Sequence, residues 1–169
     1  DYQARRILAW IYPHAEQYAE NMYQQKNSIM AISSGQLQGK GLFNTTIASV
    51  KDGNWLGTTG ETDFIFAIIG EELGFIGATL ILLLFALLIW RGFVIGVRAR
   101  DRFGSFIALG LTAQLALQVL LNIAVATNSF PNTGIGLPFF SYGGTSLMML
   151  LGQVGVILSV SRQTKPEDE

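Results

Sequence analysis

The chain has 169 residues, of which 50% are hydrophobic and 14% are charged, and its formal net charge is −1. This composition excludes a disordered segment, and the absence of a basic excess argues against a nucleic-acid-binding protein. Because the sequence has no cysteine and one histidine, a disulfide framework, a zinc finger and a histidine-rich metal centre are excluded too. Residues 103–161 contain no Asp, Glu, Lys or Arg, which is typical of an integral membrane protein.

Residues 1–62 mix aromatic, polar and charged positions, so they are too interrupted for a membrane span but suit amphipathic helices. The apolar spacing predicts one helix over residues 2–12, ended by Pro13, and a second over residues 21–34. The glycines of residues 34–41 predict a loop after the second helix. The residues alone leave open whether this loop only ends the helix or also binds a substrate.

Three apolar stretches are long enough to be membrane spans, over residues 64–90, 106–127 and 146–160. Four arginines, Arg91, Arg98, Arg100 and Arg102, lie between the first two stretches. Since short arginine-rich loops stay in the cytoplasm, we expect residues 91–102 and the C-terminal tail to be cytoplasmic and residues 1–62 and 128–142 to be extracellular. The fold class predicted is all-α: a polytopic membrane helix bundle in which a partly helical extracellular loop, 1–62, precedes the membrane part, 63–169.

Polar side chains inside the second span fall on one helix face. Gln114, Gln118 and Asn122 are spaced at i, i+4 and i+8, so we expect all three to face protein. The favoured interpretation is structural, with the amides bonding neighbouring helices, and direct contact with a substrate is the alternative.

The acidic residues beside the first span offer the candidates for chemistry. Asp63 lies where the extracellular segment becomes a membrane helix, so its carboxylate could cap that helix, act as a general base for a hydroxyl group, or help hold a divalent cation. Glu71 and Glu72 follow two turns later, and because adjacent helical residues lie about 100° apart, only one of them can face the bundle interior well.

Two tracts carry a resemblance to a known family. Residues 62–77, with Thr62-Asp63-Phe64 at their start, and residues 137–146, with Ser141-Tyr142-Gly143-Gly144, resemble the SEDS family of shape, elongation, division and sporulation proteins, which includes RodA, FtsW and SpoVE. Residues 2–7, 31–35, 39–42 and 121–123 also match family positions in the right order, so the resemblance covers nearly the whole chain.

The resemblance implies that the chain, which starts at Asp1 without a signal peptide, is the C-terminal part of a ten-span enzyme of the bacterial plasma membrane. Such an enzyme polymerises lipid II on the outer face, releases undecaprenyl diphosphate and works with a class B penicillin-binding protein in cell elongation, division or sporulation. No nucleic acid partner is expected. The family's essential aspartate maps onto Asp63, which we therefore predict to be catalytic.

Two glycine-containing tracts of the match are predicted to contact the substrate. Their residues are Gly39, Lys40, Gly41, Ser141, Tyr142, Gly143 and Gly144. No residue is predicted to be a metal ligand, and the cofactor is left open, a divalent cation such as Mg²⁺ or Mn²⁺ being compatible with a diphosphate substrate. Thr133 stands where FtsW-type proteins often have Lys, which tilts the prediction weakly towards the RodA-like elongation role.

The alternative function is a transporter that flips the lipid-linked precursor across the membrane. A flippase would use intramembrane polar groups such as Gln114, Gln118, Asn122 and Gln153 as a path, and it would tolerate an amide at Asp63 better than a glycosyltransferase would.

Overall fold

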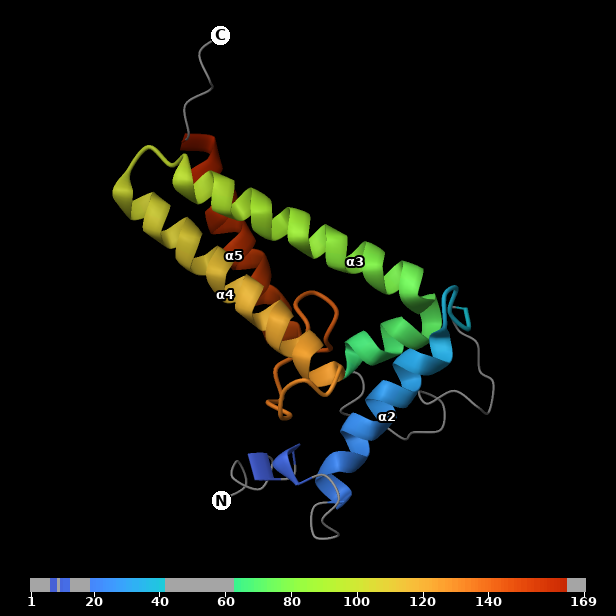
Figure 1. Ribbon diagram of the computed structural model, residues 1–169. Coiled ribbons are helices and arrows are strands. Elements are labelled where there is room, and N and C mark those ends of the chain that lie inside the picture. The colour runs from blue at the N-terminus through green and yellow to red at the C-terminus, as the bar shows by residue number, and fades with distance from the viewer. Residues whose placement is uncertain (1–6, 9, 13–18, 42–62, 164–169) are drawn as a thin grey trace.

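A computed structural model describes residues 7, 8, 10–12, 19–41 and 63–163. Within these ranges the secondary structure is entirely helical, with helices α2 (Ala19–Gly35), α3 (Ile65–Val97), α4 (Arg102–Ala126) and α5 (Gly144–Gln163) and no strand (Figure 1). Three of them, α3, α4 and α5, are long and apolar enough to cross a membrane. The prediction of an all-α fold with three candidate membrane spans is therefore confirmed, and α2 contains the second helix predicted for the N-terminal part.

Helix α3 breaks at Gly74, whose backbone angles are φ 68° and ψ −168°. The break divides the helix into a short segment, residues 65–73, and a long segment, residues 75–97, which run in different directions (Figure 1). At 1.5 Å per residue the long segment reaches about 35 Å and by itself exceeds the hydrocarbon core of about 30 Å. The span thus differs from the predicted 64–90, because the acidic residues lie before the break and the helix continues to Val97.

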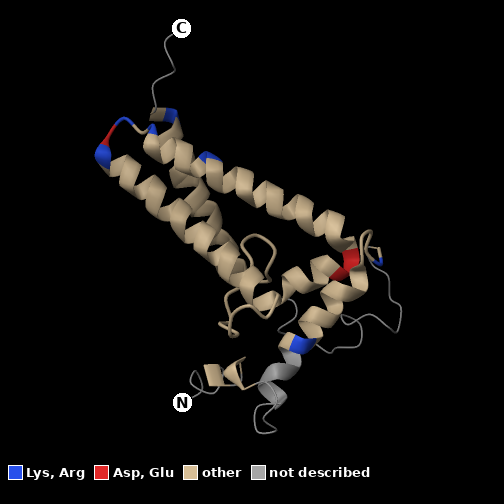
Figure 2. Ribbon diagram, in the orientation of Figure 1, with Lys and Arg blue, Asp and Glu red and all other residues tan. Residues whose placement is uncertain are grey.

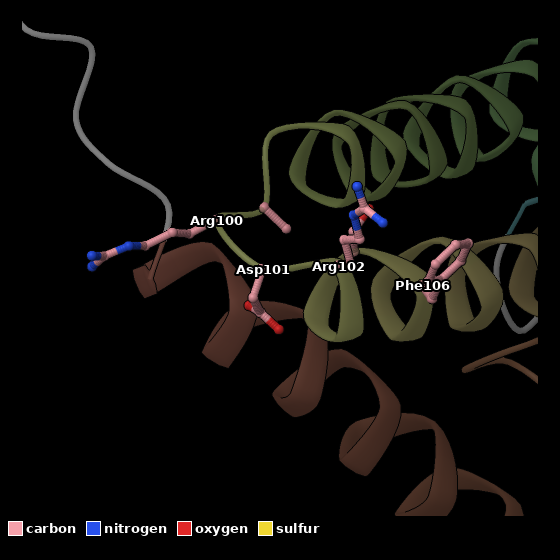
Figure 3. A pocket seen from close by; sticks show the side chains of 6 residues that line it. Arg100, Asp101, Arg102 and Phe106 are labelled. Atoms are coloured by element: carbon pink, nitrogen blue, oxygen red, sulfur yellow. The ribbon is translucent and has the colours of Figure 1, made fainter.

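The turn between α3 and α4 is shorter than the predicted arginine loop. Arg91 lies on α3, and only residues 98–101 separate the two helices. Asp101 caps α4 by accepting a hydrogen bond from the Gly104 N–H at 2.7 Å, and the Ser105 hydroxyl donates to the Gly96 carbonyl at 2.6 Å. Arg100, Asp101, Arg102 and Phe106 line a surface pocket of about 350 Å³ at this turn (Figure 3).

The charged residues of α3, α4 and the turn between them gather towards the two ends of these helices (Figure 2). Arginines lie at the turn between α3 and α4, and Glu71 and Glu72 lie beside the break in α3, at the other end. The helical surface between these ends is almost free of charge, as a membrane-spanning bundle requires.

The segment between α4 and α5, residues 127–143, folds back between the helices (Figure 1). Leu137 is 1% exposed and packs in one apolar cluster with Phe66 and Phe85 of α3 and Val119 of α4. The rings of Phe85 and Phe140 lie 6.1 Å apart. Protein therefore covers the 137–138 part of this irregular backbone, as a position beside the lipid requires.

Candidate functional site

Asp63 lies where α2, α3, α4 and the 127–143 segment meet. The next residue, Phe64, is fully buried in a cluster with Ala31 of α2, Ala67 of α3 and Val125 of α4. Burial of one phenylalanine side chain contributes about 2 to 3 kcal/mol, so this cluster anchors the backbone beside Asp63. Asp63 itself stays partly exposed.

A buried amide on α4 fixes the backbone of Asp63. The Asn122 side chain is 0% exposed, and its Nδ2 group donates to the carbonyl oxygens of Asp63 and Ile135, both at 2.8 Å. One turn earlier, Gln118 Nε2 donates to the Gly136 carbonyl at 3.1 Å. The structural interpretation of these two amides is therefore confirmed, except that their acceptors are main-chain oxygens outside the helices and not on neighbouring helices. Gln114 is exposed in this chain and does not face its neighbours as expected.

Two further side chains from α2 bind the backbone in the same region. The Ser28 hydroxyl donates to the Ala126 carbonyl at 2.8 Å, and Gln25 Nε2 donates to the Phe130 carbonyl at 3.1 Å. Carbonyls at a helix C-terminus lack partners within the helix, so these donors stabilise the end of α4 and the segment that follows it.

The capping interpretation of Asp63 is wrong. The first helical residue of α3 is Ile65, its N-cap is Phe64, and no side chain caps it. Among the described residues the Asp63 carboxylate makes no hydrogen bond or ion pair, and only the main-chain oxygen of this residue is engaged. A partly exposed carboxylate on a fixed backbone is suited to accept a proton from a bound hydroxyl group.

The described residues do not build a cation site around Asp63. No group of three His, Asp or Glu side chains lies together anywhere in the described ranges, although a divalent cation usually takes several carboxylate or carbonyl ligands.

Glu71 and Lys40 form an ion pair at the other end of the short α3 segment. Lys40 Nζ lies 2.6 Å from Glu71 Oε1, and the two side chains are 24% and 1% exposed. Glu72 is only half-buried, so one of the two adjacent acids faces inward, as predicted. The ammonium group that we predicted to contact substrate therefore neutralises a buried carboxylate.

The glycine loop completes the broken helix by an exchange of backbone hydrogen bonds. Two N–H groups of the loop donate to carbonyls before Gly74, and two N–H groups after Gly74 donate to carbonyls of the loop. The four bonds are Lys40 to Glu71 at 2.9 Å, Gly41 to Glu72 at 3.0 Å, Phe75 to Gln36 at 2.8 Å and Ile76 to Leu37 at 3.2 Å. The backbone groups that the helix break would leave without partners are thus satisfied.

This exchange bears on the predicted substrate contacts of Gly39, Lys40 and Gly41. The Gly39 N–H donates to the Gly35 carbonyl at 2.7 Å, so all three N–H groups already have protein acceptors. Lys40 also pairs with the helix eight residues, or about 12 Å, beyond Asp63. The geometry favours a structural role for the loop, and direct substrate contact stays a prediction.

The predicted contacts in the second tract lie at the entry to α5. Tyr142 is 83% exposed, and the Ser141 N–H donates to the Leu137 carbonyl at 3.0 Å. A Cβ on Gly144 would meet nothing within 4 Å, a Cβ on Gly143 would meet only the Ser146 Cβ at 3.4 Å, and neither glycine has a positive φ. Within this chain neither glycine is therefore required by its backbone geometry, and their contact with substrate stays a prediction.

Comparison with known proteins identifies the chain. The family model of FtsW, RodA and SpoVE, described as a cell cycle protein family, matches residues 1–166. The chain belongs to this SEDS family. Its membership agrees with the order of the two resembling tracts and with the three candidate spans.

Individual SEDS relatives are similar over nearly the whole chain. Stage V sporulation protein E of Bacillus subtilis is 44% identical over 164 residues, which are 97% of this chain and 43% of that protein. Proteins named probable peptidoglycan glycosyltransferase FtsW are 38% identical in Geobacter sulfurreducens and 40% identical in Coxiella burnetii, over 98% and 97% of this chain and 43% of each relative. The chain thus spans less than half the length of these relatives. They are SpoVE and FtsW proteins, so they do not support the predicted RodA-like role in elongation.

One solved structure has a similar fold over nearly the whole chain. It is described as showing the structural coordination of polymerization and crosslinking by a peptidoglycan synthase complex. The match has a TM-score of 0.70 and 28% identity, and it covers 99% of this chain and 43% of the solved chain.

Sequence reasoning found Asp63 but missed Asn122 as its partner and missed the pairing of Lys40 with Glu71. Asn122 was visible as a polar residue within a span, which marks it as a residue that needs a partner. Its acceptors are main-chain oxygens, which carry no signal in the sequence.

Proposed function

We propose that the full-length protein containing this chain is a peptidoglycan glycosyltransferase that polymerises lipid II, with Asp63 as the general base. The observation that carries the proposal is a partly exposed carboxylate, without a partner among the described residues, on a backbone that Phe64 and Asn122 hold in place. Family membership supports it, as do the relatives named peptidoglycan glycosyltransferases.

The proposed step is a glycosyl transfer between two lipid-linked sugars. A sugar hydroxyl of the acceptor attacks the anomeric carbon of the donor, a new carbon–oxygen bond forms, and the bond from that carbon to the diphosphate breaks. Asp63 accepts the hydroxyl proton as the attack proceeds, and undecaprenyl diphosphate leaves with the bonding electron pair. A base in this position contributes typically a factor of 10² to 10⁴ to the rate.

The setting of the proposed reaction is the outer face of the bacterial plasma membrane. The arginines at the turn between α3 and α4 support a cytoplasmic location for that turn. We therefore propose that Asp63, at the opposite end of α3, lies outside. We further propose a class B penicillin-binding protein as partner, in keeping with the similarity to a peptidoglycan synthase complex.

The flippase alternative has no supporting observation of this kind. Gln118 and Asn122 are two of the four polar groups that would form its path. Gln118 already donates to the Gly136 carbonyl, and Asn122 already donates to the Asp63 and Ile135 carbonyls. We therefore keep the glycosyltransferase as the one proposal.

The test is Asp63→Asn in the full-length protein, purified with its class B partner and supplied with lipid II. The amide cannot accept the proton, so we expect glycan polymerisation to fall at least a hundredfold. Glu71→Gln is the comparison, and it should reduce the amount of folded protein more than the rate per folded molecule. Long glycan strands made by Asp63→Asn at near wild-type rate would refute the role of Asp63 as base.

A further inference from the structure

One buried side chain links the candidate base to the segment that folds back into the bundle. Asn122 donates one N–H to the Asp63 carbonyl and the other to the Ile135 carbonyl, each at 2.8 Å. These residues belong to three separate parts of the chain: the residues just before α3, the second turn from the end of α4, and the 127–143 segment. A single amide therefore sets the position of the Asp63 backbone relative to both.

The orientation of this amide is determined by its neighbours. Both groups in front of Nδ2 are carbonyl oxygens, which only accept hydrogen bonds, so the amide nitrogen and not the oxygen must face them. Asn122 Oδ1 is buried without a hydrogen-bond partner among the described residues. A buried amide oxygen without a hydrogen-bond partner lowers the stability of the fold, so stability alone does not explain an asparagine at this position.

The neighbouring amide provides an internal comparison. Gln118, on the same face of α4, donates to the Gly136 carbonyl, the residue after Ile135. It binds the same segment as Asn122 but makes no bond to Asp63. The two amides thus separate the holding of the 127–143 segment from the holding of the candidate base.

We infer that Asn122 is a positioning residue for glycosyl transfer: it holds the Asp63 main chain at a fixed place relative to the 127–143 segment and acts only through Asp63. The inference rests on the proposed function. A base must lie within hydrogen-bond distance of the proton that it accepts, so a shift of about 1 Å at its backbone is enough to slow the transfer strongly.

The experiment compares Asn122→Leu with Gln118→Leu in the full-length protein with its class B partner, using lipid II polymerisation at several lipid II concentrations. Leucine fills a similar volume at residue 122 and removes both N–H donors. We expect kcat to fall ten- to hundredfold with KM changed less than threefold. We expect Gln118→Leu to lower kcat less than threefold. Melting temperatures in detergent show whether both variants stay folded.

Asn122→Asp is the second variant in case Asn122→Leu fails to fold. It keeps the shape of the side chain and replaces the N–H donors by oxygen, so it should reproduce the loss of kcat. Equal losses of kcat in Asn122→Leu and Gln118→Leu would overturn the inference, because the amides would then act together on the 127–143 segment. A normal kcat in a folded variant at residue 122 would overturn it as well.

The double variant tests whether Asn122 acts through Asp63. When Asp63→Asn has already removed the base, adding Asn122→Leu should lower the residual rate less than twofold, whereas independent roles would multiply the two losses. If Asp63→Asn itself stays active, the proposed function fails. If Asp63→Asn is inactive and the Asn122 variants are active, only the positioning role fails.

Discussion

Gly39 and Gly74 pack backbone against backbone, with no room for a side chain on either. Both have a positive φ, 77° at Gly39 and 68° at Gly74, and a Cβ on either residue would overlap the main chain around the other. The break in α3 and the loop after α2 are therefore one structural unit, built at the point where two glycines meet.

Alanine at residue 74 should disrupt this unit. Gly74→Ala places a Cβ both in a backbone region that is nearly restricted to glycine and against the loop, so we expect a loss of more than about 2 kcal/mol in stability. The measurement is the melting temperature of the purified full-length protein. Gly110→Ala on α4 is the matched control, because a Cβ there meets nothing within 4 Å, and it should leave the protein unchanged or more stable by up to about 1 kcal/mol. Equal melting temperatures for the two variants would contradict the close packing at Gly74.

Removing the cation at residue 40 should destabilise the protein more than removing both charges of the ion pair. Lys40→Met leaves a carboxylate that is 1% exposed without its cation, which costs on the order of 3 kcal/mol. Lys40→Met combined with Glu71→Gln leaves no buried charge, so we expect the double variant to melt at a higher temperature than Lys40→Met alone.

Lys26→Met is the control for this pair, since Lys26 lies on the exposed surface of α2. It should change the melting temperature little. A double variant that melts below Lys40→Met would mean that Glu71 stabilises the protein through contacts other than Lys40.

Gly144→Ala separates a substrate contact from a structural role. Because a Cβ on Gly144 meets nothing within 4 Å, we expect this variant to fold with a melting temperature within a few degrees of wild type. If Gly144 approaches the substrate, lipid II polymerisation by the folded variant should fall by about tenfold or more. Normal activity and normal stability together would remove Gly144 from the list of substrate-binding residues.

The orientation in the membrane is tested by single cysteines. The chain has none of its own, and both Thr133, in the 127–143 segment, and Arg100, in the arginine turn, are exposed. In intact cells that produce the full-length protein without other cysteines, an impermeant thiol reagent should label Thr133→Cys and should leave Arg100→Cys unlabelled. The opposite labelling would put Asp63 on the cytoplasmic side and would exclude an extracellular reaction.

The helices were predictable from the sequence because the transfer of side chains into lipid depends on local composition. The apolar stretches were enough to locate the three long helices, although not the bounds of the first, which runs to Val97 and breaks at Gly74. The break at Gly74 was not predictable in the same way, since a helical pattern tolerates an isolated glycine. Its partners come from a loop more than thirty residues earlier in the chain.

The candidate site was predictable only as far as side-chain identity carries the signal. Asp63 was found through its motif, but the hydrogen bonds around it end mostly on main-chain oxygens, such as those of Ile135 and Gly136. Every residue has such an oxygen, so only the folded backbone tells which one accepts.

The backbone exchange around Gly74 also fixes both ends of the short α3 segment. Gly41 is bonded to Glu72 at one end, and Asp63 is held by Asn122 at the other. The described contacts that place the Asp63 main chain therefore involve only residues 31–41 and 63–135. Substitutions in residues 42–62 would remove none of these contacts.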